Sequence, residues 1–144
     1  MINDIYLQLV QKLQYIGHLK SANSLLMWDE QVNLPVGSQS KRAAEMAAMA
    51  QCCHQVSSDP ELGQYLDQLE NHESDLSEDQ RTVVREAQKD FDRITRLPES
   101  FVAAQAELNS ESYHKWAKAR EENAFHEFAP SLQKQLEYAY QEAE

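Results

Sequence analysis

Residues that break helices are scarce in this chain, which has three glycines and four prolines among 144 residues. Turn-rich β proteins need more of both, because tight turns use the backbone conformations that glycine and proline favour. Ala, Leu, Gln and Glu dominate instead, and they are good or acceptable helix formers. No segment alternates apolar and polar residues as a half-buried strand does. The sequence therefore predicts an all-α protein.

Apolar residues recur every three or four positions along most of the chain, as on the buried face of a helix. With the breaks between these segments, this pattern predicts about six helices: 4–30, 38–56, 60–70, 78–97, 98–123 and 130–144. Asp59-Pro60 is a strong helix start, and Ser77 with Gln80 forms a capping box. Pro130 is expected to restart the chain as its last helix. We expect an antiparallel helical array in a single domain over residues 1–144.

The charge balance limits the partners of this chain. Its formal net charge is −11, with 24 acidic and 13 basic side chains. Nucleic acid is disfavoured, because phosphate binding needs clustered Lys and Arg. No apolar run approaches the ~20 residues that a membrane-spanning helix needs. Cys52 and Cys53 are the only cysteines, and neighbours in sequence rarely bond, so a reduced, cytoplasmic setting is expected.

The titratable residues do not form a recognisable catalytic motif. A helical zinc site of the peptidase type needs two histidines four residues apart, and no two of the five histidines have that spacing. His72-Glu73 and His126-Glu127 begin such a motif, but neither is completed. Cys52 and Cys53 are interpreted as buried structural thiols. We therefore predict no catalytic, cofactor-binding or metal-binding residue within the chain.

Several short motifs follow one another in a characteristic order. They are Trp28-Asp29, Pro35-x-Gly37, Arg93-x-x-Arg96-Leu97-Pro98, Trp116, Ala119-Arg120, Asn123-x-Phe125 and Phe128-x-Pro130. In this order they resemble the N-terminal region of the carboxypeptidase Taq family of zinc metallocarboxypeptidases. The resemblance runs from about Leu25 to the end of the chain. One departure is Ala124, which stands where the family has an acid between Asn and Phe.

The resemblance implies a larger enzyme, of which this chain would be the N-terminal portion without the lobe that carries the zinc motif. By resemblance, the complete protein releases C-terminal residues from peptides with broad specificity, using a zinc-bound water, or cobalt in some members. It also implies a helical two-lobed fold with a deep cleft, and a homodimer. The chain alone is expected to be inactive. A different class of function stays open: a stand-alone helical module for oligomerisation or protein binding.

Seven residues of these motifs are candidates for a structural or cleft-lining role: Trp28, Asp29, Arg93, Arg96, Trp116, Arg120 and Asn123. We expect Trp28 to be buried, and Asp29 to be held by Arg93, Arg96 or Arg120. Asp29 is interpreted either as part of a buried ion pair or cap, or as a residue of the substrate cleft, and the same choice applies to Arg120.

Two surfaces are also expected. Arg81, Arg85 and Lys89 lie four residues apart, and solvated ion pairs with nearby acids explain them. Apolar residues near the C-terminal end are expected to be exposed and to mediate self-association: Phe125, Phe128, Leu132, Leu136 and Tyr140.

Overall fold

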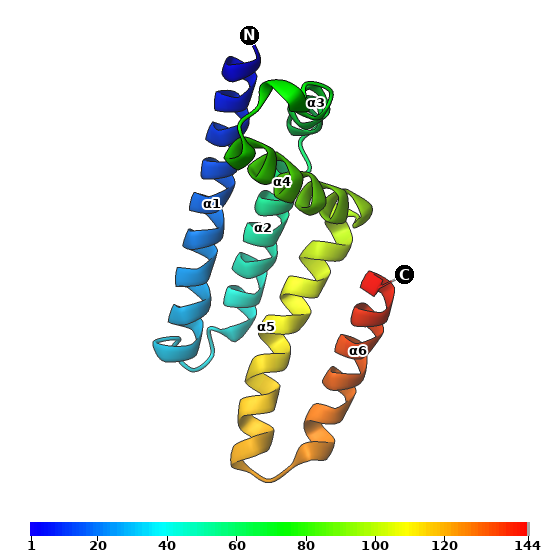
Figure 1. The fold of residues 1–144 in the computed structure, drawn as a ribbon. Coiled ribbons are helices and arrows are strands. Elements are labelled where there is room, and N and C mark those ends of the chain that lie inside the picture. Colours follow the sequence, from blue (N-terminus) through cyan, green and yellow to red (C-terminus); the bar gives the residue numbers. More distant parts are fainter. Residues whose placement is uncertain (144) are drawn as a thin grey trace. The chain divides into compact units, whose positions relative to one another are not determined.

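A computed structural model describes residues 1–143 of the chain, and over these residues it contains α-helices, one short 3₁₀ helix and no strand. The helices are α1 (Ile2–Val32), α2 (Gln39–Ser57), α3 (Pro60–Glu70), η1 (Glu73–Asp75), α4 (Glu78–Arg96), α5 (Glu99–Glu121) and α6 (Phe125–Ala143) (Figure 1). The prediction of an all-α fold with about six helices is confirmed. No helix in this range combines the length and the hydropathy needed to cross a membrane.

The two predicted helix starts have the geometry that their sequences indicate. The Asp59 side chain accepts a hydrogen bond of 2.9 Å from the backbone N–H of Glu61, and Pro60 is the first residue of α3. At α4, Ser77 Oγ accepts from the N–H of Gln80, whose side chain accepts from the N–H of Ser77. Each cap satisfies backbone donors that a helix leaves without partners in its first turn.

The last helix was predicted to begin at Pro130, but it begins at Phe125. Asn123 adopts a left-handed conformation with φ of 53° just after α5. The N–H of Ala124 donates to the carbonyl of Ala119, and the N–H of Asn123 donates to that of Arg120, which is the Schellman pattern of a helix end. The chain therefore turns at Asn123 and resumes as helix directly. Pro130 costs α6 one backbone hydrogen bond without ending it.

The chain forms two compact units, and each draws on both α1 and α2. Unit 1 comprises residues 1–22 and 52–98, and unit 2 comprises residues 23–51 and 99–144. Unit 1 therefore contains α3, η1 and α4, whereas unit 2 contains α5 and α6. The single domain expected over residues 1–144 stays a prediction.

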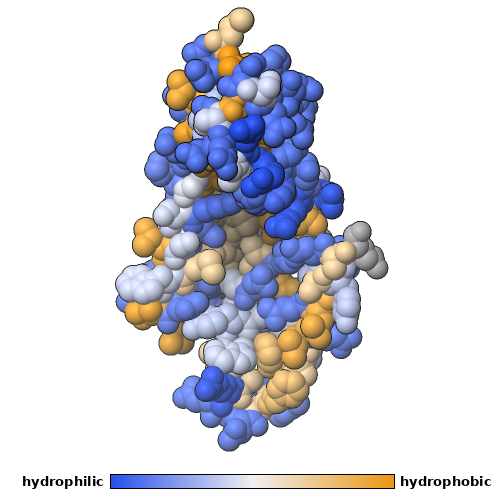
Figure 2. Space-filling model, in the orientation of Figure 1, coloured by the Kyte–Doolittle hydropathy of each residue, from blue (hydrophilic) through white to orange (hydrophobic). Residues whose placement is uncertain are grey.

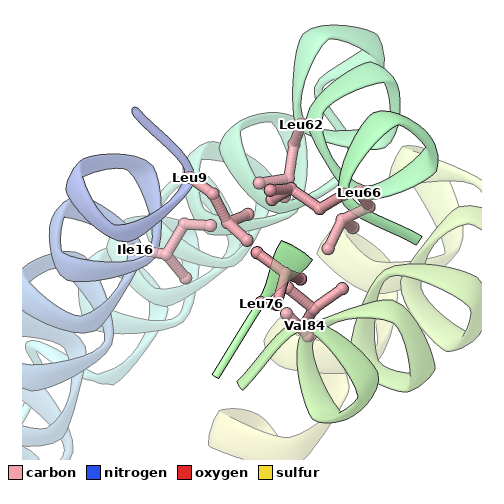
Figure 3. Close-up of a cluster of buried hydrophobic side chains, with 8 residues drawn as sticks. Leu9, Ile16, Leu62, Leu66, Leu76 and Val84 are labelled. Carbon is pink, nitrogen blue, oxygen red and sulfur yellow. The ribbon is translucent and has the colours of Figure 1, made fainter. Parts of the chain in front are cut away.

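Leucine side chains form most of the core of unit 1. They come from α1, α3 and the turn before α4, and Val84 of α4 packs against them (Figure 3). Leu9, Leu66 and Leu69 have no exposed surface. Gly63 of α3 allows a close approach, because a Cβ atom at that position would lie 2.8 Å from Cζ of Phe91.

Small side chains allow α5 and α6 of unit 2 to pack closely as an antiparallel pair (Figure 1). Ser112, Ala119 and Ser131 are at most 5% exposed. Near the other end of the pair, the rings of Phe101 and Tyr138 are in contact, with centroids 5.0 Å apart and planes tilted by 39°. The contact between these helices thus combines small residues with one aromatic pair, so that α5 and α6 hold each other in register.

The cysteines are less buried than expected. Cys52 is exposed and Cys53 is half-buried, and both are free thiols. Burial, followed by the neighbouring Cys52, raises the pKa of the Cys53 thiol. The expectation of two buried structural thiols is wrong for Cys52, because successive residues of a helix point about 100° apart and cannot both face the core.

An ion cluster joins α1 to the start of α3 in unit 1. Nζ of Lys12 lies 2.6 Å from Oδ2 of Asp59 and 2.8 Å from Oε2 of Glu61. The hydrogen bond from Lys12 is the main reason why the pKa values of Asp59 and Glu61 are lowered. The same two hydrogen bonds, that to Asp59 first, raise the pKa of Lys12. Folding therefore favours the charged form of all three groups.

This cluster predicts a specific pH dependence. Because the carboxyl pKa values are lowered on folding, their contribution to stability is complete above about pH 4.3 and is lost as the pH falls through the folded values. The contribution of Lys12 is complete below about pH 10.4 and is lost above its raised pKa. We expect Lys12→Met to destabilise unit 1 at neutral pH and to flatten both limbs of its stability profile. Urea unfolding between pH 3 and pH 11 measures this, with Lys134→Met as the control. Equal profiles for wild type and Lys12→Met would contradict the cluster's role.

Candidate functional site

The motif Trp28-Asp29-Glu30 lies in the last turns of α1, within unit 2, and its two acids bind different helices. Oδ2 of Asp29 accepts a hydrogen bond of 2.6 Å from Nη2 of Arg42 on α2. Nη1 of Arg42 also donates to the carbonyl of Leu26 at 2.9 Å, and its Nε donates to Oε2 of Glu45 at 3.1 Å. Arg42 is only 9% exposed, so a buried guanidinium fixes the end of α1 to the start of α2.

The ion pair changes the protonation of both partners. Arg42 is the main cause of the lowered pKa of Asp29, and the amide of Asn33 contributes a second hydrogen bond. Asp29 in turn is the main cause of the raised pKa of Arg42. Asp29 is therefore an anion throughout the neutral range and a permanent acceptor for Arg42, which gives it a structural role in this unit.

Glu30 is buried and forms a second link, to α5. Its side chain is 7% exposed, and its Oε1 lies 3.1 Å from Nε2 of His114. The hydroxyl of Ser110 donates to the same oxygen. These three residue types also make up catalytic triads, but in a triad the histidine accepts the serine proton and lies between serine and acid. Here serine and histidine both bind the carboxylate, so the cluster satisfies a buried acid and does not activate a nucleophile.

We expected Trp28 to be buried, and this prediction is wrong, because Trp28 is 58% exposed. The two acids that follow it both bind neighbouring helices, Asp29 on α2 and Glu30 on α5. Trp28 precedes Asp29 by one position on the helix, so its side chain points about 100° away from that of Asp29, toward solvent. Leu25 and Val32, which are three and four positions from Trp28, are also exposed (68% and 60%).

The predicted partners of Asp29 were wrong, since Arg42 takes that place. Arg93 and Arg96 lie in the last turn of α4, where their charge suits the helix dipole. Both are exposed, and neither forms an ion pair or hydrogen bond within residues 1–143. These two candidates belong to unit 1, whereas Asp29 belongs to unit 2.

The remaining candidates lie together at the end of α5. The guanidinium of Arg120 lies over the ring of Trp116, with 5.4 Å from Cζ to the ring centroid. With Asn123 at the turn, these residues border a cavity of about 260 Å³ whose other walls are Ala119, Phe125 and Phe128. Asn123 has a clear structural role, because its left-handed backbone ends α5. Trp116 is 39% exposed.

No metal site is present among residues 1–143, where no three His, Cys, Asp or Glu side chains are grouped for binding an ion. The residues of this region therefore do not fit the metal that the family resemblance implies. The chemistry of the cluster around Asp29 and Glu30 is that of positioning: two carboxylates, each with its donors, hold α1, α2 and α5 together.

Sequence reasoning missed Arg42, Glu30, Ser110 and His114. Arg42 had a usable signal: it is the fourth residue of α2, where the helix dipole disfavours a cation, so a specific acidic partner was to be expected. Ser110 and His114 are four residues apart and therefore share one face of α5. Nothing in the sequence indicated that this face meets Glu30, because 80 residues separate Ser110 from Glu30.

Comparisons with known proteins now identify the region. Thermostable carboxypeptidase 1 of Thermus thermophilus is 28% identical over 141 residues, which are 96% of this chain and 28% of that protein. Carboxypeptidase 1 of Bacillus subtilis is 25% identical over 126 residues. The crystal structure of an M32 carboxypeptidase from Deinococcus radiodurans R1 superposes with a TM-score of 0.75 at 32% identity, over 97% of this chain and 28% of that one. The BsuCP crystal structure has the same fold, with a TM-score of 0.90 at 22% identity, over 96% of this chain and 28% of that one.

The helical fold and these matches place the chain in a family of metallopeptidases. The chain belongs to the carboxypeptidase Taq (M32) family, whose family model matches residues 8–144. It spans 28% of the length of Thermostable carboxypeptidase 1 of Thermus thermophilus. The family predicted from the Trp28-Asp29 and Asn123-x-Phe125 motifs is confirmed.

The contacts of Arg42 predict a clear difference from its neighbour Lys41. Arg42→Met removes the donor of the Leu26 carbonyl and leaves Asp29 with only the amide of Asn33, so we expect the free energy of unfolding to fall by about 1–3 kcal/mol. Lys41→Met is the matched control: Lys41 is exposed and 3.8 Å from Glu45, and its loss is expected to stay within about 0.5 kcal/mol. Urea denaturation at pH 7 measures both, and NMR titration is expected to show the pKa of Asp29 rising in Arg42→Met. Equal effects of the two variants would show that the Arg42 network does not hold α1 to α2.

Proposed function

We propose that this chain is the N-terminal helical region of a metal-dependent carboxypeptidase that releases C-terminal amino acids from peptides with broad specificity. The observation that carries this proposal is the match of the family model to residues 8–144. The superposition with an M32 carboxypeptidase at 32% identity supports it. The names of the relatives supply the reaction class, and peptides are the proposed substrates.

In this proposal the catalytic metal, zinc or cobalt, is held by residues outside this chain. None of the five histidines has the spacing of a helical ligand pair, and residues 1–143 hold no grouped set of ligands. When bound, the metal supplies the activated water of a metallopeptidase. The region described here forms part of one lobe beside the substrate cleft. The Arg42–Asp29 pair fixes the end of α1, while exposed side chains such as Trp28, Trp116 and Arg120 are the proposed cleft-lining residues.

The proposal is tested with two proteins. The 144-residue chain alone is expected to retain no stoichiometric zinc after dialysis and to release no amino acid from a blocked dipeptide. A chimera carries this chain in place of the matching region of Thermostable carboxypeptidase 1 of Thermus thermophilus. We expect it to cleave the same dipeptide in a metal-dependent way. Turnover by the chain alone, or a folded chimera that binds metal but stays inactive, would argue against the assigned role. A reading frame that continues into a His-Glu-x-x-His segment would support it directly.

We further propose that the cytoplasmic protein forms a homodimer and that α6 lies at the contact. Three of its apolar side chains are exposed: Phe125 (65%), Leu136 (52%) and Tyr140 (73%), whereas Phe128 and Leu132 are half-buried. Figure 2 shows apolar residues gathered on the surface of this helix at the lower right. An exposed apolar face of this kind favours association, and a two-fold dimer buries one patch on both partners.

Light scattering coupled to size-exclusion chromatography tests this contact on the 144-residue chain. We expect a dimer, and we expect Leu136→Glu to shift it to monomer, because a charge at the interface centre would be buried without a partner. Leu7→Glu, at a leucine of similar exposure on α1 (57%), is the control and is expected to leave the dimer intact. A strict monomer at high concentration would instead favour a stand-alone helical module.

A further inference from the structure

The side chain of His54 on α2 reaches the C-terminal end of α4 within unit 1. Its Nε2 lies 2.7 Å from the carbonyl oxygen of Leu97 and 3.2 Å from that of Ile94. His54 is 43 and 40 residues away from these two partners in the sequence. Both contacts are therefore tertiary, and they join two helices that are not consecutive along the chain.

The end of α4 has carbonyl groups that need donors. The last four carbonyls of an α-helix have no N–H group farther along the helix to bind. The N–H of Leu97 donates to the carbonyl of Ile94 at 3.2 Å. His54 lies within hydrogen-bonding distance of that carbonyl and of the carbonyl of Leu97. A side chain from α2 thus takes the place that a capping residue at the end of the same helix usually has.

The dipeptide Leu97-Pro98 explains why the Leu97 carbonyl is available to α2. A residue before proline avoids the helical conformation, because the proline ring clashes with its backbone. Leu97 is accordingly extended, with φ of −95° and ψ of 126°. Its carbonyl leaves the course of α4 and makes the shorter of the two contacts with His54. The proposed function assigns no role to this part of the Arg93-x-x-Arg96-Leu97-Pro98 motif, and here it presents an acceptor to another helix.

The two carbonyl partners determine which ring nitrogen of His54 carries a proton. A carbonyl oxygen only accepts hydrogen bonds, so Nε2 is the donor in both contacts. Nδ1 is buried and has no partner among residues 1–143. A proton on Nδ1 would be a buried donor without an acceptor, which is unfavourable. His54 is therefore the Nε2–H tautomer.

We propose that His54 is the C-terminal cap of α4 and that the order of the last turn of α4 depends on this single donor. The cap is a conformational device built from α2 and from Leu97-Pro98. If the ring only filled space between the helices, any side chain of similar size would replace it. The proposal does not depend on the carboxypeptidase assignment, since all residues of the cap belong to unit 1.

The proton position is measured on the wild-type 144-residue chain by ¹H–¹⁵N correlation NMR of the imidazole rings at about pH 8, above the ordinary imidazole pKa. We expect Nε2 of His54 to be protonated and its proton to give a resolved signal, because a hydrogen-bonded N–H exchanges slowly with water. His18 is exposed, and its ring proton is expected to exchange too fast to be seen. A proton on Nδ1 of His54, or exchange as fast as that of His18, would overturn the proposal.

Two variants separate the donor from the ring. Glutamine places its amide nitrogen near the position of Nε2, whereas the shorter asparagine places it near Nδ1. We expect His54→Asn to speed hydrogen exchange of the Leu97 amide and of the last turn of α4 about tenfold, and His54→Gln to stay within about twofold of wild type. His72→Asn is the control, because His72 is exposed and its Nδ1 contacts the carbonyl of Gln68 near the end of α3. Equal exchange in the Asn and Gln variants would show that His54 acts through packing alone and would refute the cap.

The proline provides an independent test. Pro98→Ala removes the restriction on Leu97, so we expect Leu97 to enter the helix and the resolved Nε2–H signal of His54 to be lost. Pro60→Ala, at the first residue of α3, is the control and is expected to keep that signal. An unchanged signal in Pro98→Ala would contradict the role assigned to Leu97-Pro98.

Discussion

The buried guanidinium of Arg42 is the interaction on which unit 2 depends most. A charged group that is 9% exposed is tolerable only if its donors are satisfied, and Arg42 meets this condition through the carbonyl of Leu26 and the carboxylates of Asp29 and Glu45. These partners come from the last turns of α1 and from α2 itself. An ion pair therefore joins the two helix ends on either side of the loop with Pro35 and Gly37. This contact fixes the start of α2 relative to the end of α1.

Glu30 extends this arrangement to α5. Its buried carboxylate needs donors for the same reason, and Ser110 and His114 provide them from one helix face. Adjacent acids thus tie the end of α1 to two different helices. Trp28, the preceding residue, is left facing solvent.

Local sequence signals predicted most of the fold, because they act over four residues or fewer. The cap at Asp59, the capping box at Ser77 and the break at Pro35 all lie where the sequence placed them. Pro130 was misjudged, since the left-handed turn at Asn123 already reverses the chain and the helix tolerates the proline. The candidate site was predicted less well. Asp29 was correctly predicted to bind an arginine of another helix. The predicted partners were arginines of the family motifs, whereas the actual partner is the buried Arg42.

The sequence by itself determined the all-α class, the main helix boundaries and the family, because helix periodicity, caps and short motifs are local properties of the chain. Only the tertiary structure decided which charges meet. The pairing of Asp29 with Arg42, the burial of Glu30 against α5 and the exposure of Trp28 depend on the rotation of each helix about its axis. That rotation is set by the packing of whole faces, in which small residues such as Ser112 and Ala119 allow close approach, and no single motif encodes it.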